Sequence, residues 1–207
     1  MKITWYGDTC FEIASTSQDK ENISVQIDLK ESEKKSGKFG ADILLKTTAS
    51  EEVKPKTDGQ FVISAFGEYE IKEIFVQGIP SLTLEKKQNI IYIVDGEGIR
   101  VCHLGMFGED DLNEEQLENI GRVDILIVPI NGDTTIGFRE AEKIIARIEP
   151  KVVIPTAYNP KKPEALAAFL KAMGEKDIIP QDKYSIQKKN LGARDEEKAE
   201  IIILEQK

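Results

Sequence analysis

The chain has 207 residues, of which 40% are hydrophobic and 31% charged, a mixture typical of a soluble globular protein. Its formal net charge is −9 at pH 7, and an acidic surface repels phosphate backbones, so we expect no broad nucleic-acid binding. No apolar run approaches roughly 18 residues and no signal peptide is visible, so we expect a cytoplasmic protein without a membrane span.

The first hundred residues are typical of short strands separated by turns. We expect strands at Lys2–Tyr6, Cys10–Ala14, Ile23–Ile27, Asp42–Lys46, Phe61–Ser64, Tyr69–Ile71, Ile74–Val76 and Leu82–Leu84. The segment Lys30–Gly40 is polar, with lysines interleaved among glutamates and serines, and predicts a solvated loop. Asp95-Gly96-Glu97 separates the apolar runs Asn89–Val94 and Gly98–His103, which predicts a hairpin.

The second half alternates strands with helices. Asn113 followed by Gln116 matches a capping box, and Gly121 ends that short helix. A strand, a helix with one apolar stripe and a second strand then form a βαβ unit, whose strands should be parallel. These are Asp124–Ile130, the helix with Ala141, Ile144, Ile145 and Ile148, and Val152–Pro155. A further helix over Pro163–Met173 and strands at Tyr184–Gln187 and Glu200–Leu204 complete the chain.

No linker rich in proline, glycine or serine divides the chain, so we expect one domain over residues 1–207. Cys10 and Cys102 are the two cysteines, and they lie far apart in the sequence. Two cysteines in a chain of this length favour reduced, buried thiols over a disulfide framework. Cys102 follows Val101 on an apolar strand, which favours a core position over a reactive one.

Six segments together resemble the zinc-dependent hydrolases of the metallo-β-lactamase superfamily, in that family's order and over most of the chain. They are Met1–Ile13, Ala41–Glu52, Phe61–Ser81, Ile90–Gly108, Val123–Gly132 and Lys151–Tyr158. The resemblance implies an α/β (α+β) fold, a four-layer αββα sandwich of two mixed sheets. It also implies a metal site on loops at one edge of the two packed sheets.

The resemblance implies metal ligands at positions where this chain carries other residues. The family's His-x-His-x-Asp-His motif corresponds to Thr47, Ala49, Glu51 and Glu52. A third histidine is retained as His103, whereas the expected bridging aspartate is Met106 and the last histidine is Ala157. Asp8 stands where this branch commonly has a histidine near the N-terminus.

The whole chain contains one histidine, and zinc sites that activate water commonly use several. We therefore expect no cofactor and no zinc. An alternative is that Asp8, Glu51, Glu52 and His103 converge to hold Mn²⁺ or Mg²⁺. Against this, Glu51 and Glu52 equally suit the first turn of a solvated helix. His103 itself is either a remaining ligand or general base, or a histidine hydrogen-bonded in place at a strand end.

These observations lead us to expect a non-catalytic protein that acts by binding. The bound molecule would be a small molecule in the former pocket, or a protein such as an active paralogue or a second copy. We expect Met106 with Phe107 to fill the emptied cavity, since a hole costs stability. The alternative is a hydrolase of esters, lactones or phosphates that uses His103 with Asp8, Glu51 or Glu52.

Overall fold

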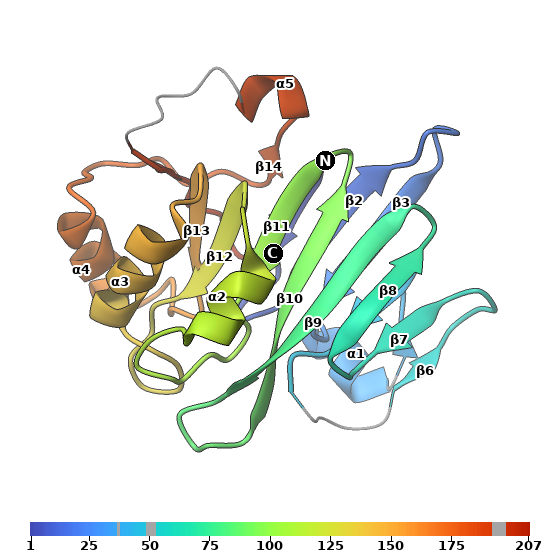
Figure 1. Ribbon diagram of the computed structural model, residues 1–207, viewed down its shortest axis with the longest axis horizontal. Coiled ribbons are helices and arrows are strands. Elements are labelled where there is room, and N and C mark those ends of the chain that lie inside the picture. The colour runs from blue at the N-terminus through green and yellow to red at the C-terminus, as the bar shows by residue number, and fades with distance from the viewer. Residues whose placement is uncertain (37, 49–52, 192–197) are drawn as a thin grey trace.

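Two mixed β-sheets pack face to face in the computed structural model, with helices on their outer faces (Figure 1). The structure describes residues 1–36, 38–48, 53–191 and 198–207. The metallo-β-lactamase-like sandwich expected from the sequence is therefore confirmed. Within those ranges, no helix has both the length and the apolar character needed to cross a membrane.

The six-stranded sheet has the order β14, β1, β2, β3, β5, β7. Its strands are β1 (Lys2–Trp5), β2 (Phe11–Thr16), β3 (Asn22–Ile27), β5 (Ile43–Leu45), β7 (Phe61–Ile63) and β14 (Tyr184–Ser185). Alternation along the strands decides which side chains enter the core, because successive side chains point to opposite faces. Ile43 and Leu45 join the main core, whereas Leu44 packs with Leu29, Phe39 and Ala41 in a second cluster.

The seven-stranded sheet has the order β15, β13, β12, β11, β10, β9, β8. Its strands are β8 (Gly67–Ile71), β9 (Ile74–Leu82), β10 (Gln88–Gly96), β11 (Ile99–His103), β12 (Ile125–Pro129), β13 (Val152–Thr156) and β15 (Glu200–Ile201). Strands β12 and β13 are parallel, with Ile127 opposite Ile154, so the expected βαβ unit is confirmed. Both strands are buried along their whole length, as expected for parallel strands covered on both faces.

Helices α2 (Glu114–Ile120), α3 (Phe138–Ile148) and α4 (Glu164–Ala172) lie together on one side of this sheet (Figure 1). The capping box of Asn113 and Gln116 is present at the start of α2, and Gly121 caps its end. The remaining elements are α1 (Glu31–Ser36), α5 (Lys188–Leu191) and a two-stranded sheet of β4 (Lys38–Phe39) and β6 (Lys54–Pro55). Both cysteines are free and buried, as expected.

Three local expectations were wrong. The segment Lys30–Gly40 is not a loop, because buried Glu33 accepts hydrogen bonds from the Lys30 and Gly40 main chains and thereby holds α1 in place. The expected strand Ile74–Val76 extends to Leu82 as β9, so that of the expected strand Leu82–Leu84 only Leu82 is in a strand and Thr83 and Leu84 lie after its end.

The third correction concerns the turn between β10 and β11. It is formed by Glu97 and Gly98, with φ of 54° and 68°, and not by Asp95 and Gly96. Two positive φ angles in a two-residue turn match the twist of the flanking strands.

Candidate functional site

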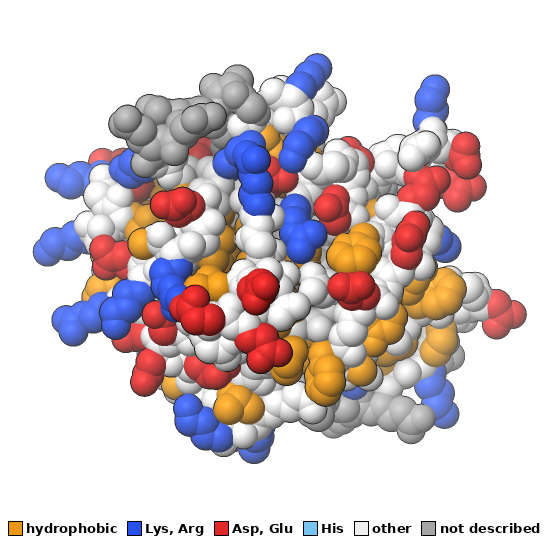
Figure 2. Space-filling view, viewed as in Figure 1, with side chains coloured by type: hydrophobic (Ala, Val, Ile, Leu, Met, Phe, Trp, Pro, Cys, Tyr) orange, Lys and Arg blue, Asp and Glu red, His pale blue; other side chains and the backbone are white. Residues whose placement is uncertain are grey.

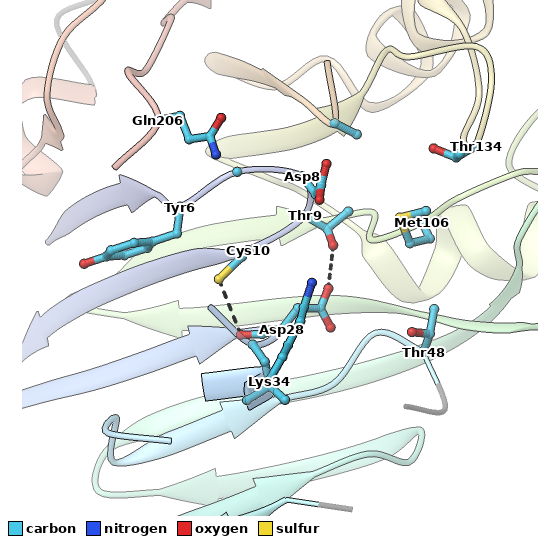
Figure 3. A pocket seen from close by; sticks show the side chains of 13 residues that line it. Tyr6, Asp8, Thr9, Cys10, Asp28, Lys34, Thr48, Met106, Thr134 and Gln206 are labelled. Carbon is cyan, nitrogen blue, oxygen red and sulfur yellow. Dashed lines mark hydrogen bonds between the residues drawn. The ribbon is translucent and has the colours of Figure 1, made fainter. Parts of the chain in front are cut away.

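A cavity of about 800 Å³ opens where the carboxyl ends of strands from both sheets meet. This is the edge at which open α/β sheets bind ligands. Asp28 follows β3, Thr48 follows β5, Met106 follows β11, Thr134 follows β12 and Ala157 follows β13. The turn between β1 and β2, helix α1 and the C-terminal segment complete the lining with Tyr6, Gly7, Asp8, Thr9, Cys10, Leu29, Lys34 and Gln206 (Figure 3).

Asp28 connects three segments beneath the cavity. Its Oδ2 accepts hydrogen bonds from Thr9 Oγ1 at 2.6 Å and from Thr47 Oγ1 at 2.7 Å, and its Oδ1 accepts one from the Thr47 main chain at 2.9 Å. Burial raises the pKa of this carboxyl, and these three hydrogen bonds oppose the rise. Asp28 therefore joins the ends of β3 and β5 to the β1–β2 turn.

Asp8 lies on that turn, in a left-handed conformation with φ of 42°. Its carbonyl oxygen accepts hydrogen bonds from Trp5 Nε1 at 2.9 Å, from the Ala157 main chain at 3.3 Å and from Thr156 Oγ1. Its carboxylate lines the cavity, where no described residue forms a hydrogen bond or ion pair with it. The main chain of Asp8 is thus fixed while its side chain is available to a bound molecule.

His103 is fully buried at the end of β11 and packs edge-on against Phe11, with 5.4 Å between ring centroids. Its Nδ1 accepts a hydrogen bond from the Gly105 main chain at 3.0 Å, so the neutral ring carries its proton on Nε2. Burial lowers the pKa of His103 to about 3. The Thr9 main chain slightly favours protonation, yet Nε2 has no aligned hydrogen-bond partner among the described residues.

Met106 lies on the wall of the cavity and does not fill it, so the expectation of a filled pocket was wrong. The Met106 main chain donates to Asn89 Oδ1 at 2.8 Å, and this hydrogen bond holds the residue at the cavity edge. Phe107, the neighbouring residue, is fully buried in the core. One bulky side chain of the pair therefore packs the interior, while the other faces the opening.

The structure brings together some of the residues that the sequence indicated. Asp8, Met106 and Ala157 line the cavity, whereas Thr47 and His103 are buried and do not line it. Ala49, Glu51 and Glu52, with the solvated helical turn expected there, lie outside the described residues.

Sequence reasoning missed Asp28 and Lys34. The signal for Asp28 was a charged residue directly after a strand that ends at Ile27. Lys34 carried no such signal, because its approach to Asp28 depends on the position of α1.

A metal centre of the type implied by the family resemblance does not fit the described residues. His103 Nε2 is a buried nitrogen without a hydrogen-bond partner in the described part of the chain, which is one feature of a ligand. However, no group of three or more His, Cys, Asp or Glu side chains that could hold an ion occurs in the described part of the chain. Thr47, Met106 and Ala157 do not supply the imidazoles and carboxylates that zinc commonly uses.

Comparisons with known proteins identify the family. A model of the β-lactamase superfamily domain matches residues 2–157. A UPF0173 protein of Pyrococcus abyssi is 28% identical over 183 residues, covering 77% of this chain and 84% of the relative. A UPF0173 metal-dependent hydrolase of Pyrococcus furiosus is 37% identical over 90 residues, covering 41% of this chain and 39% of the relative.

A solved structure from Thermotoga maritima extends the likeness to the whole chain. It is described as a Zn-dependent hydrolase of the metallo-β-lactamase superfamily and aligns with a TM-score of 0.73 and 26% identity. The alignment covers 100% of this chain and 99% of that one.

These names contradict the expectation that zinc is absent, which was therefore wrong as stated. The single histidine excludes a centre built from several imidazoles, but oxygen ligands and water serve other metal sites, so a histidine count does not decide metal binding. The family match covers residues 2–157, which is most of the chain. The chain therefore belongs to the β-lactamase superfamily.

Proposed function

We propose that this chain acts by binding a small molecule in the cavity, and that the Asp8 carboxylate accepts hydrogen bonds from it. The observation that carries the proposal is the contrast between the main chain and the side chain of Asp8. Its carbonyl oxygen accepts three hydrogen bonds that fix the turn, and its carboxylate has no partner among the described residues. Such a group is preorganised to receive a donor, which lowers the entropic cost of binding.

The charges around the cavity favour a neutral or cationic molecule. Its described lining includes two carboxylates, Asp8 and Asp28, and one ammonium, Lys34. Figure 3 shows the Lys34 side chain directed toward Asp28, and Lys34 lowers the pKa of Asp28. Lys34 is thus directed at Asp28, which leaves Asp8 as the carboxylate of the lining without a partner among the described residues. An anionic ligand would be repelled, and a hydrogen-bond donor or amine would be attracted.

The chain contains one tryptophan, which supplies a direct assay. Trp5 Nε1 donates to the Asp8 carbonyl, so its fluorescence should report on ligand entry at the Asp8 turn. We expect n-butylammonium to produce a saturable change and butyrate, which has the opposite charge, to produce none. Asp8→Asn should weaken n-butylammonium binding about 10-fold or more, because a charge-assisted hydrogen bond is lost.

Asp19→Asn is the matched control, because Asp19 is an exposed acid on the turn between β2 and β3. It should leave the n-butylammonium affinity unchanged. An equal response to butyrate, or an Asp8→Asn variant with unchanged affinity, would contradict the proposal. Metal content should be measured on the same samples, since the relatives are named metal-dependent hydrolases.

Hydrolysis is the second candidate function, favoured by the relatives' names and by the buried, unpartnered Nε2 of His103. This candidate uses His103 with Asp8, Glu51 or Glu52. It predicts turnover of an ester, lactone or phosphate that is lost in both His103→Gln and His103→Ala. Full activity of both folded variants against such a panel would exclude this role for His103.

A protein partner or a second copy of the chain also remains a prediction. Figure 2 shows hydrophobic side chains gathered over the region of β8 and β9. On β7 and the loop after it, Phe61, Val62 and Phe66 are 43%, 39% and 57% exposed. Sedimentation of the purified protein over a range of concentrations would reveal self-association.

A further inference from the structure

A second cavity, of about 490 Å³, adjoins the first at Met106. Three residues, Thr48, Met106 and Thr134, line both cavities. The far wall of the second cavity consists of Thr83, Leu84, Glu85 and Lys87, on the turn between β9 and β10, and of Gln88 at the start of β10. The two spaces are therefore separated by one short set of side chains.

The main chain of this divider is held in place. Fully buried Asn89 accepts a hydrogen bond from the Met106 main chain and donates to the Leu104 carbonyl at 2.9 Å. Gly105 has a φ of 63°, and a Cβ there would lie 2.6 Å from Asn89 Oδ1. The thioether side chain of Met106 is unbranched and adaptable, so it can change rotamer while its main chain stays fixed.

The far wall is also fixed. The Gly108 main chain donates to the Leu82 carbonyl at 2.8 Å. A Cβ on Gly108 would lie 1.9 Å from the Leu84 nitrogen, so only glycine allows the two backbones to approach this closely. The second cavity is thus preformed by the packing of the β9–β10 turn against the loop after β11.

The chemistry of the second cavity differs from that of the first. Glu85 and Lys87 form an ion pair at 2.5 Å, so their charges offset each other, and Asp133 adds one further carboxylate to the lining. Leu84 is 40% exposed and lines this space together with Met106. Covering this apolar surface with a ligand's hydrocarbon would be favourable by about 25 cal/mol per Å².

We propose that the two cavities form one elongated site with Met106 as the specificity-determining divider. The site takes an amphiphile whose neutral or cationic, hydrogen-bond-donating head lies at Asp8. Its apolar chain passes Met106 and covers Leu84. This inference rests on the proposed function, because it needs Asp8 to hold the head of the same molecule.

A series of n-alkylammonium ions from ethyl to octyl, titrated against Trp5 fluorescence, tests this inference. For wild-type protein we expect affinity to rise about 3- to 4-fold for each methylene that becomes buried. Octylammonium should therefore bind at least 10-fold more tightly than ethylammonium. Met106→Trp should block the passage and bring the octyl-to-ethyl ratio close to 1, whereas Met106→Ala should retain a high ratio.

Leu84→Asp should also lower the ratio, because it places a charge where the chain would lie. Leu82→Ala is the control, since Leu82 is exposed on β9 and lines neither cavity. Ammonium binding that depends on Asp8 but not on chain length would overturn this inference and leave the proposed function standing. Absence of any ammonium binding would overturn both.

Discussion

The floor and the rim of the two adjoining cavities are built in opposite ways. The floor, which we define as Thr9, Asp28, Thr47, Asn89 and Gly108, consists of groups whose hydrogen-bonding or packing capacity is used within the protein. The rim, which we define as Asp8, Met106 and Leu84, presents a carboxylate, a thioether and an isobutyl group to open space. At one edge of the sheets, some residues thus bond or pack within the protein, while their neighbours face open space.

This difference indicates how the site can change without loss of the fold. Polar groups on the floor connect strands, so their removal leaves buried partners unsatisfied. Side chains on the rim face open space, so we expect their replacement to alter binding more than stability. Substitutions in the two regions should therefore separate stability from affinity.

Gly108→Ala should have the largest effect. Its Cβ would meet backbone atoms of Thr83 and Leu84, which no side-chain rotation can relieve. We expect a loss of about 3 kcal/mol or more in the free energy of unfolding, as for overpacked sites, measured by urea denaturation. Gly40→Ala is the control, because the nearest atom to its Cβ among the described residues would be Lys56 Nζ, at the flexible end of that side chain, 3.7 Å away. Equal stability of the two variants would refute the close packing of the β9–β10 turn.

Asn89→Ala should have the second-largest effect on stability. The Asn89 side chain bonds to Ser81 Oγ, the Leu104 carbonyl and the Met106 main chain, all in the interior. Leaving these groups unsatisfied should cost about 2–4 kcal/mol of unfolding free energy. Asn119→Ala, at an exposed site where the amide donates to the Glu115 carbonyl and accepts a long hydrogen bond of 3.5 Å from Gln77 Nε2, should cost less than about 0.5 kcal/mol. Chemical denaturation of both variants would show whether Asn89 contributes this much to the free energy of unfolding.

Asp28→Asn should change how stability depends on pH. Because the folded pKa of Asp28 is raised above 3.8, its contribution is greatest below pH 3.8 and is lost as pH rises through the folded pKa. Each pKa unit of difference between the folded and the unfolded state corresponds to about 1.4 kcal/mol of unfolding free energy. The variant should lack this decline. As pH rises from 3.8, the free energy of unfolding of the wild type should therefore fall relative to that of the variant.

Asp42→Asn should change the pH dependence of stability in the opposite direction. Burial opposes ionisation of Asp42, but Lys72 and Ser24 hold its pKa below 3.8. The wild type should therefore lose this contribution as pH falls through the lowered folded pKa. Parallel pH titrations of unfolding that moved in the same direction for both variants would contradict the assignment of Asp28 to a buried floor.

Asp8→Asn should have the smallest effect on stability. Asparagine tolerates the left-handed backbone at this position, and the hydrogen bonds to the turn involve the Asp8 carbonyl, which is retained. We expect a change below about 0.5 kcal/mol in unfolding free energy, together with the loss of n-butylammonium affinity described above. A variant that unfolds much more readily would place Asp8 on the floor instead of the rim.

Local patterns in the sequence determined much of the fold. The capping box at Asn113, the apolar stripe of α3 and the fully apolar strands around it were sufficient to predict the βαβ unit. Where local signals were weaker than long-range contacts, prediction failed. Gly78 and Pro80 lie between the two strands expected at Ile74–Val76 and Leu82–Leu84, yet β9 continues through them because it pairs with β10 along its length.

The sequence alone also determined that a centre built from several histidines cannot form, since only one histidine exists. Only the tertiary structure decided that an open cavity remains, that His103 is buried behind it and that Asp28 joins three strand ends. The physical reason is that residue type limits which chemistry is available, while accessibility and partnership arise from segments far apart in the chain. Asp8 and Asp28 share one residue type, and their different neighbours leave the Asp8 carboxylate facing the cavity while the Asp28 carboxylate links segments of the protein.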